Sequence, residues 1–314
     1  MGDESQIQRG AGSQQAPSPP SYSAALLAAF LSAAFGANAV AIKVSLAGLG
    51  PFTNAGLRFT LASATLLLYA RSAHLPLEFN RDRLRHLLYL TPLFVLQFSL
   101  MYHGIDKTNA SRATLMMNLQ PFFVFFMAHF LIPGDRMTGR KMLALVLGFF
   151  GVAFVFFEEK GVTSDFRTGD LFMLLATLIW ASRSVYMKRI MHAFGSFHLV
   201  LYPMMLSVPF FFLEGLLWDE PMVAKLDLKI LAALCYQGLL MASFGFVVWN
   251  YLLRMHGAVW LNAFNFIMPV TGVMLGVLLL GEPMTLKIWL ALFLVTSGIL
   301  VIQVGVRKPV ITPK

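Results

Sequence analysis

The sequence predicts an all-α membrane protein in which ten transmembrane helices form two inverted five-helix repeats around a central cavity. Three observations lead to this fold class. Of the 314 residues, 58% are hydrophobic and only 12% are charged, a balance that suits lipid better than water. The apolar residues are gathered into ten long runs. A motif of the first half of the chain also recurs in the second half.

Each run approaches or exceeds the length that crosses a hydrocarbon core, which takes about 20 helical residues. Apolar and polar residues do not alternate along the runs, so a transmembrane β-barrel is excluded. The predicted spans are residues 23–44, 52–70, 86–104, 110–132, 142–157, 171–190, 197–218, 230–253, 258–280 and 288–306.

The ends of the chain are polar. Residues 1–22 are rich in Gly, Ser, Gln and Pro and carry too little apolar surface to offset the entropy of ordering, so we expect a disordered tail. They do not resemble a signal peptide, because few basic residues precede a first apolar run that is long enough to remain as a helix. Residues 307–314 are expected to be a cytoplasmic tail. The single cysteine, Cys235, has no partner for a disulfide or a cysteine-based metal site.

Lys and Arg are unevenly distributed between alternate connections. With the N-terminus inside, the inner connections carry more Lys and Arg, while the outer ones carry fewer, Arg112 among them, together with most of the acids. The sequence therefore predicts a multi-pass protein of the cytoplasmic membrane with both termini cytoplasmic. Because this topology accounts for the net charge of +9, no nucleic-acid partner is expected.

The turn that follows the fourth predicted helix is repeated after the ninth. The segment LIPGDRMTGRKMLALVLGFFGVAFVF is answered 147 positions later by LLLGEPMTLKIWLALFLVTSGILVIQ, and FGANAVAIKVSLAGLGPF near the start of the chain resembles IWASRSVYMKRIMHAFGSF. The paired residues include Gly134 and Gly281, Asp135 and Glu282, Val40 and Val185, Lys43 and Lys188, Gly50 and Gly195, Phe98 and Phe246, and Pro121 and Pro269.

Five helices are thus expected in each copy. Because five is odd, the second copy enters the membrane from the opposite face, and a pseudo-two-fold axis lies in the membrane plane. Inverted repeats commonly serve alternating access, in which two similar halves open a central site first to one side and then to the other. The alternative is that duplication merely enlarged a membrane scaffold.

Three segments carry a resemblance to a known family. They are the small and aromatic segment that ends in Lys43, NASRATLMMNLQPFF in the fourth predicted helix, and the GEPMT turn. They resemble the EamA branch of the drug/metabolite transporter superfamily. The resemblance implies two repeats, at 23–157 and 169–306, a cavity lined mainly by helices 1 to 4 and 6 to 9, and export of amino acids, other metabolites or drugs. Asp135 stands where members more often have Glu, which keeps the charge.

Basic residues within the predicted helices need an explanation, because a charge at the bilayer centre costs about 2.5–3.5 kcal/mol. Lys43 and Lys188 lie at opposite ends of their helices and either reach the headgroups or act as gating charges at two mouths. Arg58 and Arg183 lie deeper, yet still within reach of the headgroups. If they face the cavity, the shortage of Asp and Glu in the spans makes a substrate carboxylate or phosphate their natural partner.

The same shortage bears on energy coupling. Proton-driven carriers usually place an Asp, Glu or His in the pathway, and only His103 and His129 are available here, each near a helix end. Both are also explained as packed or interfacial residues. Facilitated export or exchange therefore stays open, and no cofactor or metal is predicted.

Amide and aromatic side chains cluster on the helices expected to line the cavity. An amide is costly in hydrocarbon unless its hydrogen bonds are satisfied, so these residues should face a wet interior, with interhelical hydrogen bonding as the alternative. Pro121 and Pro269 predict paired kinks, either hinges or static bends. The predicted substrate-binding residues are Phe35, Asn38, Arg58, Gln97, Tyr102, Asn118, Trp180, Arg183, Trp249, Asn262 and Asn265.

Together these features predict a secondary transporter that exports a small metabolite, an amino acid or a related carboxylate-bearing solute, by alternating access. A structural or receptor-like membrane protein and a membrane enzyme are the alternatives. No helix carries paired acids, a Ser and His arrangement or an HExxH motif, which argues against the enzyme. The expected partners are a small-molecule substrate and the lipid bilayer, and the sequence does not predict the oligomeric state.

Overall fold

The computed structural model describes residues 21–75, 81–131, 137–156, 164–190 and 197–304. Over these ranges the chain is helical, with one isolated β-bridge between Leu49 and Val223 and no β-strand. The all-α prediction is therefore confirmed for the described part of the chain. Most of the predicted N-terminal tail, the predicted tail at 307–314, and Asp135 lie outside it.

The helices follow one another through short connections. In chain order they are α1 (Tyr22–Leu46), α2 (Pro51–Ser72), α3 (Arg81–Lys107), α4 (Ala110–Met117), α5 (Gln120–Leu131), α6 (Gly139–Phe156), α7 (Ser164–Ile190), α8 (His198–Trp218), α9 (Leu228–Cys235), the π-helix η2 (Tyr236–Gly245), α10 (Phe246–Asn262), α11 (Ile267–Leu280) and α12 (Leu286–Val304).

Eight helical stretches of the described chain are long and apolar enough to cross a membrane, so this is a multi-pass membrane protein. Within α12, Leu286–Ile302 is a shorter apolar helix. α2 does not count among the eight, since Asn54 and Arg58 lower its hydropathy. Ten spans therefore remain a prediction. The eight stretches are Tyr22–Leu46, Leu84–Lys107, Ala110–Leu131, Gly139–Phe156, Phe166–Ile190, His198–Trp218, Leu228–Leu253 and Trp260–Leu280.

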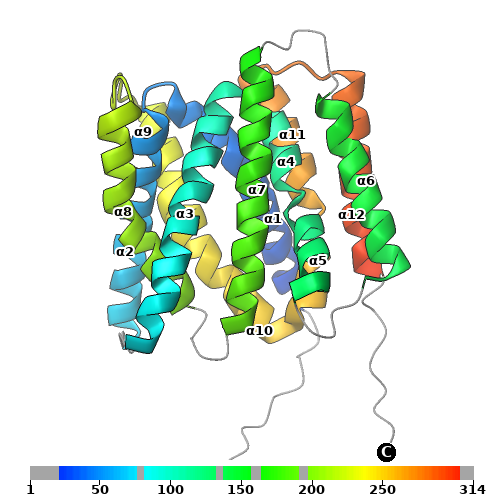
Figure 1. The fold of residues 1–314 in the computed structure, drawn as a ribbon, viewed down its shortest axis with the longest axis horizontal. Coiled ribbons are helices and arrows are strands. Elements are labelled where there is room, and N and C mark those ends of the chain that lie inside the picture. Colours follow the sequence, from blue (N-terminus) through cyan, green and yellow to red (C-terminus); the bar gives the residue numbers. More distant parts are fainter. Residues whose placement is uncertain (1–20, 76–80, 132–136, 157–163, 191–196, 305–314) are drawn as a thin grey trace, which may run out of the picture.

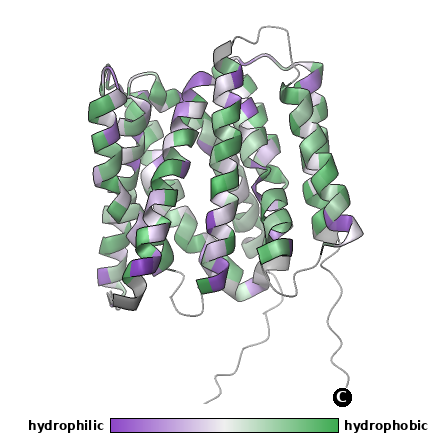
Figure 2. Cartoon of the chain, viewed as in Figure 1, coloured by the Kyte–Doolittle hydropathy of each residue, from purple (hydrophilic) through white to green (hydrophobic). Residues whose placement is uncertain are grey.

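The helices stand side by side as one bundle (Figure 1). α1 begins and α12 ends at its lower edge in that view, and we call the opposite edge the upper side. Figure 2 colours much of the ribbon of these helices as hydrophobic, and many of the apolar side chains are exposed. Leu216, Leu278 and Phe293, for example, are 68–71% exposed. An apolar surface of this extent is stable when lipid covers it.

The two halves of the chain are packed into each other. The most extensive helix contacts join α1 to α11, α2 to α8, α3 to α7 and α6 to α12, so each pairs a helix of the first half with one of the second. Phe59, Tyr102, Phe122 and Phe211 belong to the main apolar core and are almost fully buried. Neither half has a separate core of this size.

Two of the predicted membrane-spanning segments are interrupted near their middle. α4 gives way to α5 over Asn118 and Leu119, and α10 gives way to α11 over residues 263–266. Pro121 and Pro269 follow these interruptions at equivalent positions. Because proline has no N–H to donate to the preceding turn, a helix ends or bends just before it. The kinks predicted at the two prolines are present as breaks.

The crossing that runs from α9 to α10 contains the π-helix η2, a form that is rare and often found at functional sites. At the end of this crossing Gly257 has φ 80° and interrupts α10. Glycine adopts this left-handed conformation without strain, because it has no Cβ. The boundary between the eighth and ninth predicted spans therefore lies at Gly257.

α1 and α11 touch through their backbones at Gly36. A Cβ atom on Gly36 would lie 2.4 Å from the carbonyl oxygen of Met268, and one on Gly272 would lie 2.7 Å from the carbonyl oxygen of Gly36. Real Cβ atoms do not approach other atoms so closely. Small residues at this crossing therefore set the distance between two helices that border the central cavity.

The alanine variant of Gly36 tests this close approach. In Gly36→Ala the added methyl group must push α1 away from α11, and we expect a loss of about 1–3 kcal/mol in the free energy of unfolding. Thermal unfolding in detergent, followed by tryptophan fluorescence, measures the effect. Gly139→Ala is the matched control, since a Cβ at Gly139 meets nothing within 4 Å. Equal melting temperatures for the two variants would contradict the interpretation.

Candidate functional site

A cavity of about 380 Å³ lies between the two interrupted crossings. Both halves of the chain contribute to its walls, and its volume suits one small organic molecule. The lining residues are Phe35, Gly36, Asn38, Ala39, Arg58, Gln97, Phe98, Met101, Thr114, Met117, Asn118, Gln120, Pro121, Trp180, Trp249, Asn262, Asn265, Met268 and Ile299.

Most of the residues predicted to bind substrate meet in this cavity. Tyr102 and Arg183 do not line it, nor do Pro269, Lys43 and Lys188. Binding by the lining residues stays a prediction, but their convergence from distant parts of the sequence is a structural fact. Those brought together are Phe35, Asn38, Arg58, Gln97, Asn118, Pro121, Trp180, Trp249, Asn262 and Asn265.

Arg58 places a positive charge in the cavity wall. Its side chain is only 7% exposed, and its Nη1 donates a hydrogen bond to the hydroxyl of Tyr102 at 3.2 Å. That hydroxyl donates in turn to Oε1 of Gln237 at 2.7 Å, and Nε2 of Gln237 donates to Oγ of Ser45 at 2.8 Å. The chain of hydrogen bonds fixes the guanidinium against neutral groups. Tyr102 thus supports Arg58 by a hydrogen bond without itself lining the cavity.

Several polar atoms of the wall have no hydrogen-bond partner within the described residues. They are Nε of Arg58, Oδ1 of Asn38, Oε1 of Gln97, Oγ1 of Thr114 and Oδ1 of Asn265. Unsatisfied buried polar groups are costly, so they indicate groups that water or a solute satisfies. Donors and acceptors are thus both available to a molecule in the cavity.

Aromatic side chains supply the apolar part of the wall. Phe35 and Trp249 meet edge to face with ring centroids 5.6 Å apart, and Phe98 and Trp180 add further rings. Such surfaces bind the apolar part of a solute, while the polar atoms fix its orientation. The arrangement suits a small amphipathic molecule.

Arg183 lies outside the wall, against the rings of α3. Its guanidinium carbon is 4.7 Å from the ring centroid of Phe94 and 6.0 Å from that of Phe98, and its Nε has no hydrogen-bond partner within the described residues. The guanidinium carbon of Arg58 is 5.7 Å from the same ring centroid of Phe98. Neither arginine forms an ion pair with an Asp or Glu of the described ranges.

Lys43 occupies a place that the sequence did not predict. Its Nζ donates to the carbonyl oxygens of Ile105 and Asp106 at 2.8 and 2.7 Å. It therefore satisfies the last carbonyl groups of α3, where a positive charge is also favourable to the helix dipole. Lys188 is exposed near the end of α7.

The two histidines considered for proton transfer lie away from the cavity. His103 stacks on Phe52, with ring centroids 5.9 Å apart, and Nδ1 of His129 accepts the N–H of Met137 at 3.1 Å. Neither contributes to the wall. Within the described residues, no three His, Cys, Asp or Glu side chains form a group that could hold a metal ion.

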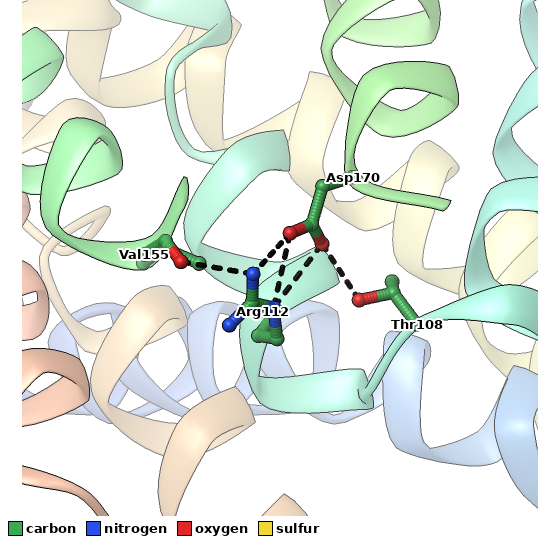
Figure 3. A network of polar contacts seen from close by, with 4 residues as sticks. All are labelled: Thr108, Arg112, Val155 and Asp170. Atoms are coloured by element: carbon green, nitrogen blue, oxygen red, sulfur yellow. Dashed lines mark hydrogen bonds and ion pairs between the residues drawn. The ribbon is translucent and has the colours of Figure 1, made fainter. Parts of the chain in front are cut away.

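A buried ion pair was missed in the sequence. Arg112, expected in an outer connection, lies in α4 and is 2% exposed, and its guanidinium pairs with the fully buried Asp170 of α7 (Figure 3). Asp170 also accepts from Oγ1 of Thr108 at 2.6 Å, and Nη2 of Arg112 donates to the carbonyl oxygen of Val155 at 2.8 Å. Arg112 is the third residue of α4, within the predicted span 110–132, and not in the connection before it. Its partner was missed because Asp170 is distant in sequence.

Two further acids of the second half hold helix starts of the first half. The carboxylate of Glu282 accepts the N–H groups of Ala110 and Ser111 at 2.6 and 2.9 Å, and that of Asp219 accepts the N–H and hydroxyl of Thr53, both at 2.7 Å. A carboxylate at a helix N-terminus satisfies free N–H groups and complements the dipole. The Glu of the GEPMT turn thus has a structural partner that sequence alone did not reveal.

Comparison with known proteins decides the family. The family model described as "EamA-like transporter family" matches twice, over residues 22–157 and 167–304. The chain belongs to the EamA-like transporter family. Its two matches cover most of the chain and account for the pairing of motifs found in the sequence.

Similar proteins bear transporter names. An uncharacterized transporter of Bacillus subtilis, YoaV, is 24% identical over 262 residues, which are 83% of this chain and 89% of that protein. A probable amino-acid metabolite efflux pump of Escherichia coli is 25% identical over 291 residues, which are 90% of this chain and 95% of that protein. A solved crystal structure superposes with a TM-score of 0.67 at 18% identity, covering 91% of this chain and 98% of that chain, which shows the same fold. The EamA-like protein is therefore a membrane transporter and not an enzyme.

The Arg112–Asp170 pair gives a stability prediction for this EamA-like transporter. Asp170→Asn leaves the buried guanidinium of Arg112 without a counter-charge, and we expect a loss of about 3–5 kcal/mol in the free energy of unfolding. Thermal unfolding in detergent measures it.

Two controls show whether the loss comes from the unpaired charge of Arg112. Glu220→Gln, at an exposed position, should change stability by less than about 0.5 kcal/mol. The double variant Arg112→Met with Asp170→Leu should recover much of the loss, because it removes both charges together. An Asp170→Asn protein as stable as wild type would show that the pair contributes nothing.

Proposed function

We propose that this EamA-like protein is a secondary exporter of a small carboxylate-bearing metabolite, an amino acid or a related solute. Its ten helices form two inverted halves, 23–157 and 169–306, that alternate access to the cavity between them. It lies in the cytoplasmic membrane with both termini on the cytoplasmic side, as the distribution of Lys and Arg favours.

The observation that carries the proposal is that Arg58, in the wall of the cavity, has no Asp or Glu partner among the described residues. Arg58 is only 7% exposed, and its one side-chain hydrogen-bond partner among the described residues is the neutral hydroxyl of Tyr102. A buried guanidinium without a counter-ion is expensive. A carboxylate on the solute offers the planar, charge-assisted contact that would offset this cost.

The cavity wall also offers hydrogen-bond acceptors that fit the ammonium group of an amino acid. Oδ1 of Asn38 and Oε1 of Gln97 accept no hydrogen bond from the described residues, and an ammonium group has three N–H donors. The curated relatives from Escherichia coli and Salmonella typhimurium are both named probable amino-acid metabolite efflux pumps. These names support an amino-acid-like solute but leave its side chain open.

The pattern of helix contacts supports two halves related by a two-fold exchange. If helices 1 to 5 correspond to 6 to 10, exchange of the halves turns the α1–α11 contact into that of α7 with α4 and α5, and the α3–α7 contact into that of α1 with α9 and η2. All of these contacts occur. α2–α8 and α6–α12 map onto themselves, as contacts on a two-fold axis do. The interruptions before Pro121 and Pro269 also correspond, and we propose them as the hinges of the cycle.

The charges at the helix ends are proposed as gates. Lys43 ties α1 to the end of α3 on the upper side, and its repeat partner Lys188 lies at the opposite end of the bundle. Breaking the Lys43 contacts is required if α1 and α3 separate when the cavity opens upward. Because neither His103 nor His129 reaches the cavity, the proposed cycle runs without a cavity proton carrier, as facilitated export or exchange.

Flux through proteoliposomes tests the proposal. Amino acids and other metabolites are offered as a panel, each carboxylate beside the amide that replaces the carboxylate, such as phenylalanine beside phenylalaninamide. We expect flux only for carboxylate forms. Arg58→Ala should raise KM by about 10- to 100-fold, the loss of a charged hydrogen bond worth about 1.5–3 kcal/mol, and Arg58→Lys should restore part of it.

Arg71→Ala, at an exposed position near the end of the same helix, is the control and should leave flux unchanged. Equal transport of acids and amides, or wild-type flux in Arg58→Ala, would reject the role of Arg58. Absence of flux for every solute would reject the carrier itself.

A further inference from the structure

The repeat register pairs an asparagine of the cavity wall with an arginine outside it. The register that matches Lys43 with Lys188 also matches Phe35 with Trp180 and Asn38 with Arg183. Phe35, Trp180 and Asn38 all line the cavity, whereas Arg183 does not. Ala39 likewise lines the cavity while its repeat partner Ser184 does not, so the two halves are in different conformations along this stretch.

In an inverted-repeat carrier the state of opposite exposure arises when the two halves exchange their conformations. A residue whose repeat partner lines the cavity now takes that place after the exchange. α7 then adopts the present position of α1, and Arg183 comes to the wall where Asn38 is now. The same exchange withdraws Asn38.

The present surroundings of Arg183 are those of a cation without a permanent partner. Its guanidinium rests on the rings of Phe94 and Phe98, its Nε has no hydrogen-bond partner within the described residues, and no carboxylate there pairs with it. Stacking on aromatic rings compensates a buried cation only in part. The ion pair of Arg112 and Asp170 shows how this protein treats a cation that serves structure alone.

Arg58 lines the cavity now, and its repeat partner is an apolar residue. The register places its repeat partner between positions 203 and 206, an apolar stretch of α8, so no second arginine replaces it in the exchange. Both guanidinium carbons lie within about 6 Å of the ring centroid of Phe98, and therefore less than about 12 Å from each other. Each state thus offers the cavity one arginine, and both guanidinium groups lie close to the ring of Phe98.

We propose that Arg58 holds the carboxylate of the solute in the state seen here and that Arg183 holds it in the state of opposite exposure. The solute is handed past Phe98 from one guanidinium to the other as the halves exchange. This inference rests on the proposed function, since it requires alternating inverted halves and an anionic group. It adds a second anion-binding residue that acts in only one of the two states.

Cysteine labelling from each face of the membrane tests the exchange without knowledge of the solute. In a Cys235→Ser background, single cysteines are placed at Asn38, Arg58 and Arg183 and exposed to a membrane-impermeant methanethiosulfonate, in right-side-out and in inside-out vesicles. We expect the first two to react from one face and Arg183→Cys from the other, with a rate ratio of at least about tenfold between faces.

Ser184→Cys guards against misfolding of the arginine variant. It is nearly isosteric, and its repeat partner Ala39 also lines the cavity, so it should react from the same face as Arg183→Cys. Reaction of all four cysteines from one face would overturn the handover while leaving a carrier with Arg58 intact. Protection of Arg183→Cys and Ser184→Cys from both faces would overturn it as well.

Failure of the proposed function gives a different result. If cysteines at Asn38 and Arg58 react from neither face, the cavity does not open to water and the carrier itself is wrong. Arg183→Ala provides a second comparison in the flux assay with phenylalanine. There the handover predicts a raised KM from one face only, whereas a purely structural arginine would change the values from both faces alike.

Discussion

The structure depends on two helix interruptions that face each other inside a bundle surrounded by lipid. In hydrocarbon every backbone N–H and C=O needs a partner from the protein, so an interrupted helix is tolerated only where it borders protein or water. Both breaks use tight turns: the N–H of Phe122 reaches the carbonyl of Leu119 and that of Ile267 reaches Phe264, each at 3.0 Å. Placing the breaks together confines the irregular backbone to one interior space, and that space is the cavity.

Three arginines within the helices divide into two kinds by their partners. Arg112 has a carboxylate, a backbone carbonyl and almost no exposure, and it joins α4 to α6 and α7. Arg58 and Arg183 have rings and neutral groups instead. The difference identifies which cations are compensated by the fold and which require something from outside it.

Much of the cavity could be predicted from the sequence, because amides and aromatic residues in apolar helices have few other acceptable places. Asn38, Gln97 and Trp249 were found in this way. The breaks followed from Pro121 and Pro269. The partner of Arg112 could not be found, since periodicity reports which side of a helix a residue occupies but not which distant residue it meets. The predicted span at 52–70 corresponds to α2, which is not among the eight apolar stretches. Arg58 and Asn54 face the interior and lower the hydropathy of this helix.

The acids on the upper side have a consequence for biogenesis. Asp170, Asp219 and Glu282 all belong to the second half, yet they satisfy Arg112 and the first N–H groups of α2 and α4 in the first half. A ribosome delivers residue 282 long after α4 has left it. The first N–H groups of α4 therefore lack this carboxylate until nearly the whole second half has been made, so the start of α4 is completed late in synthesis.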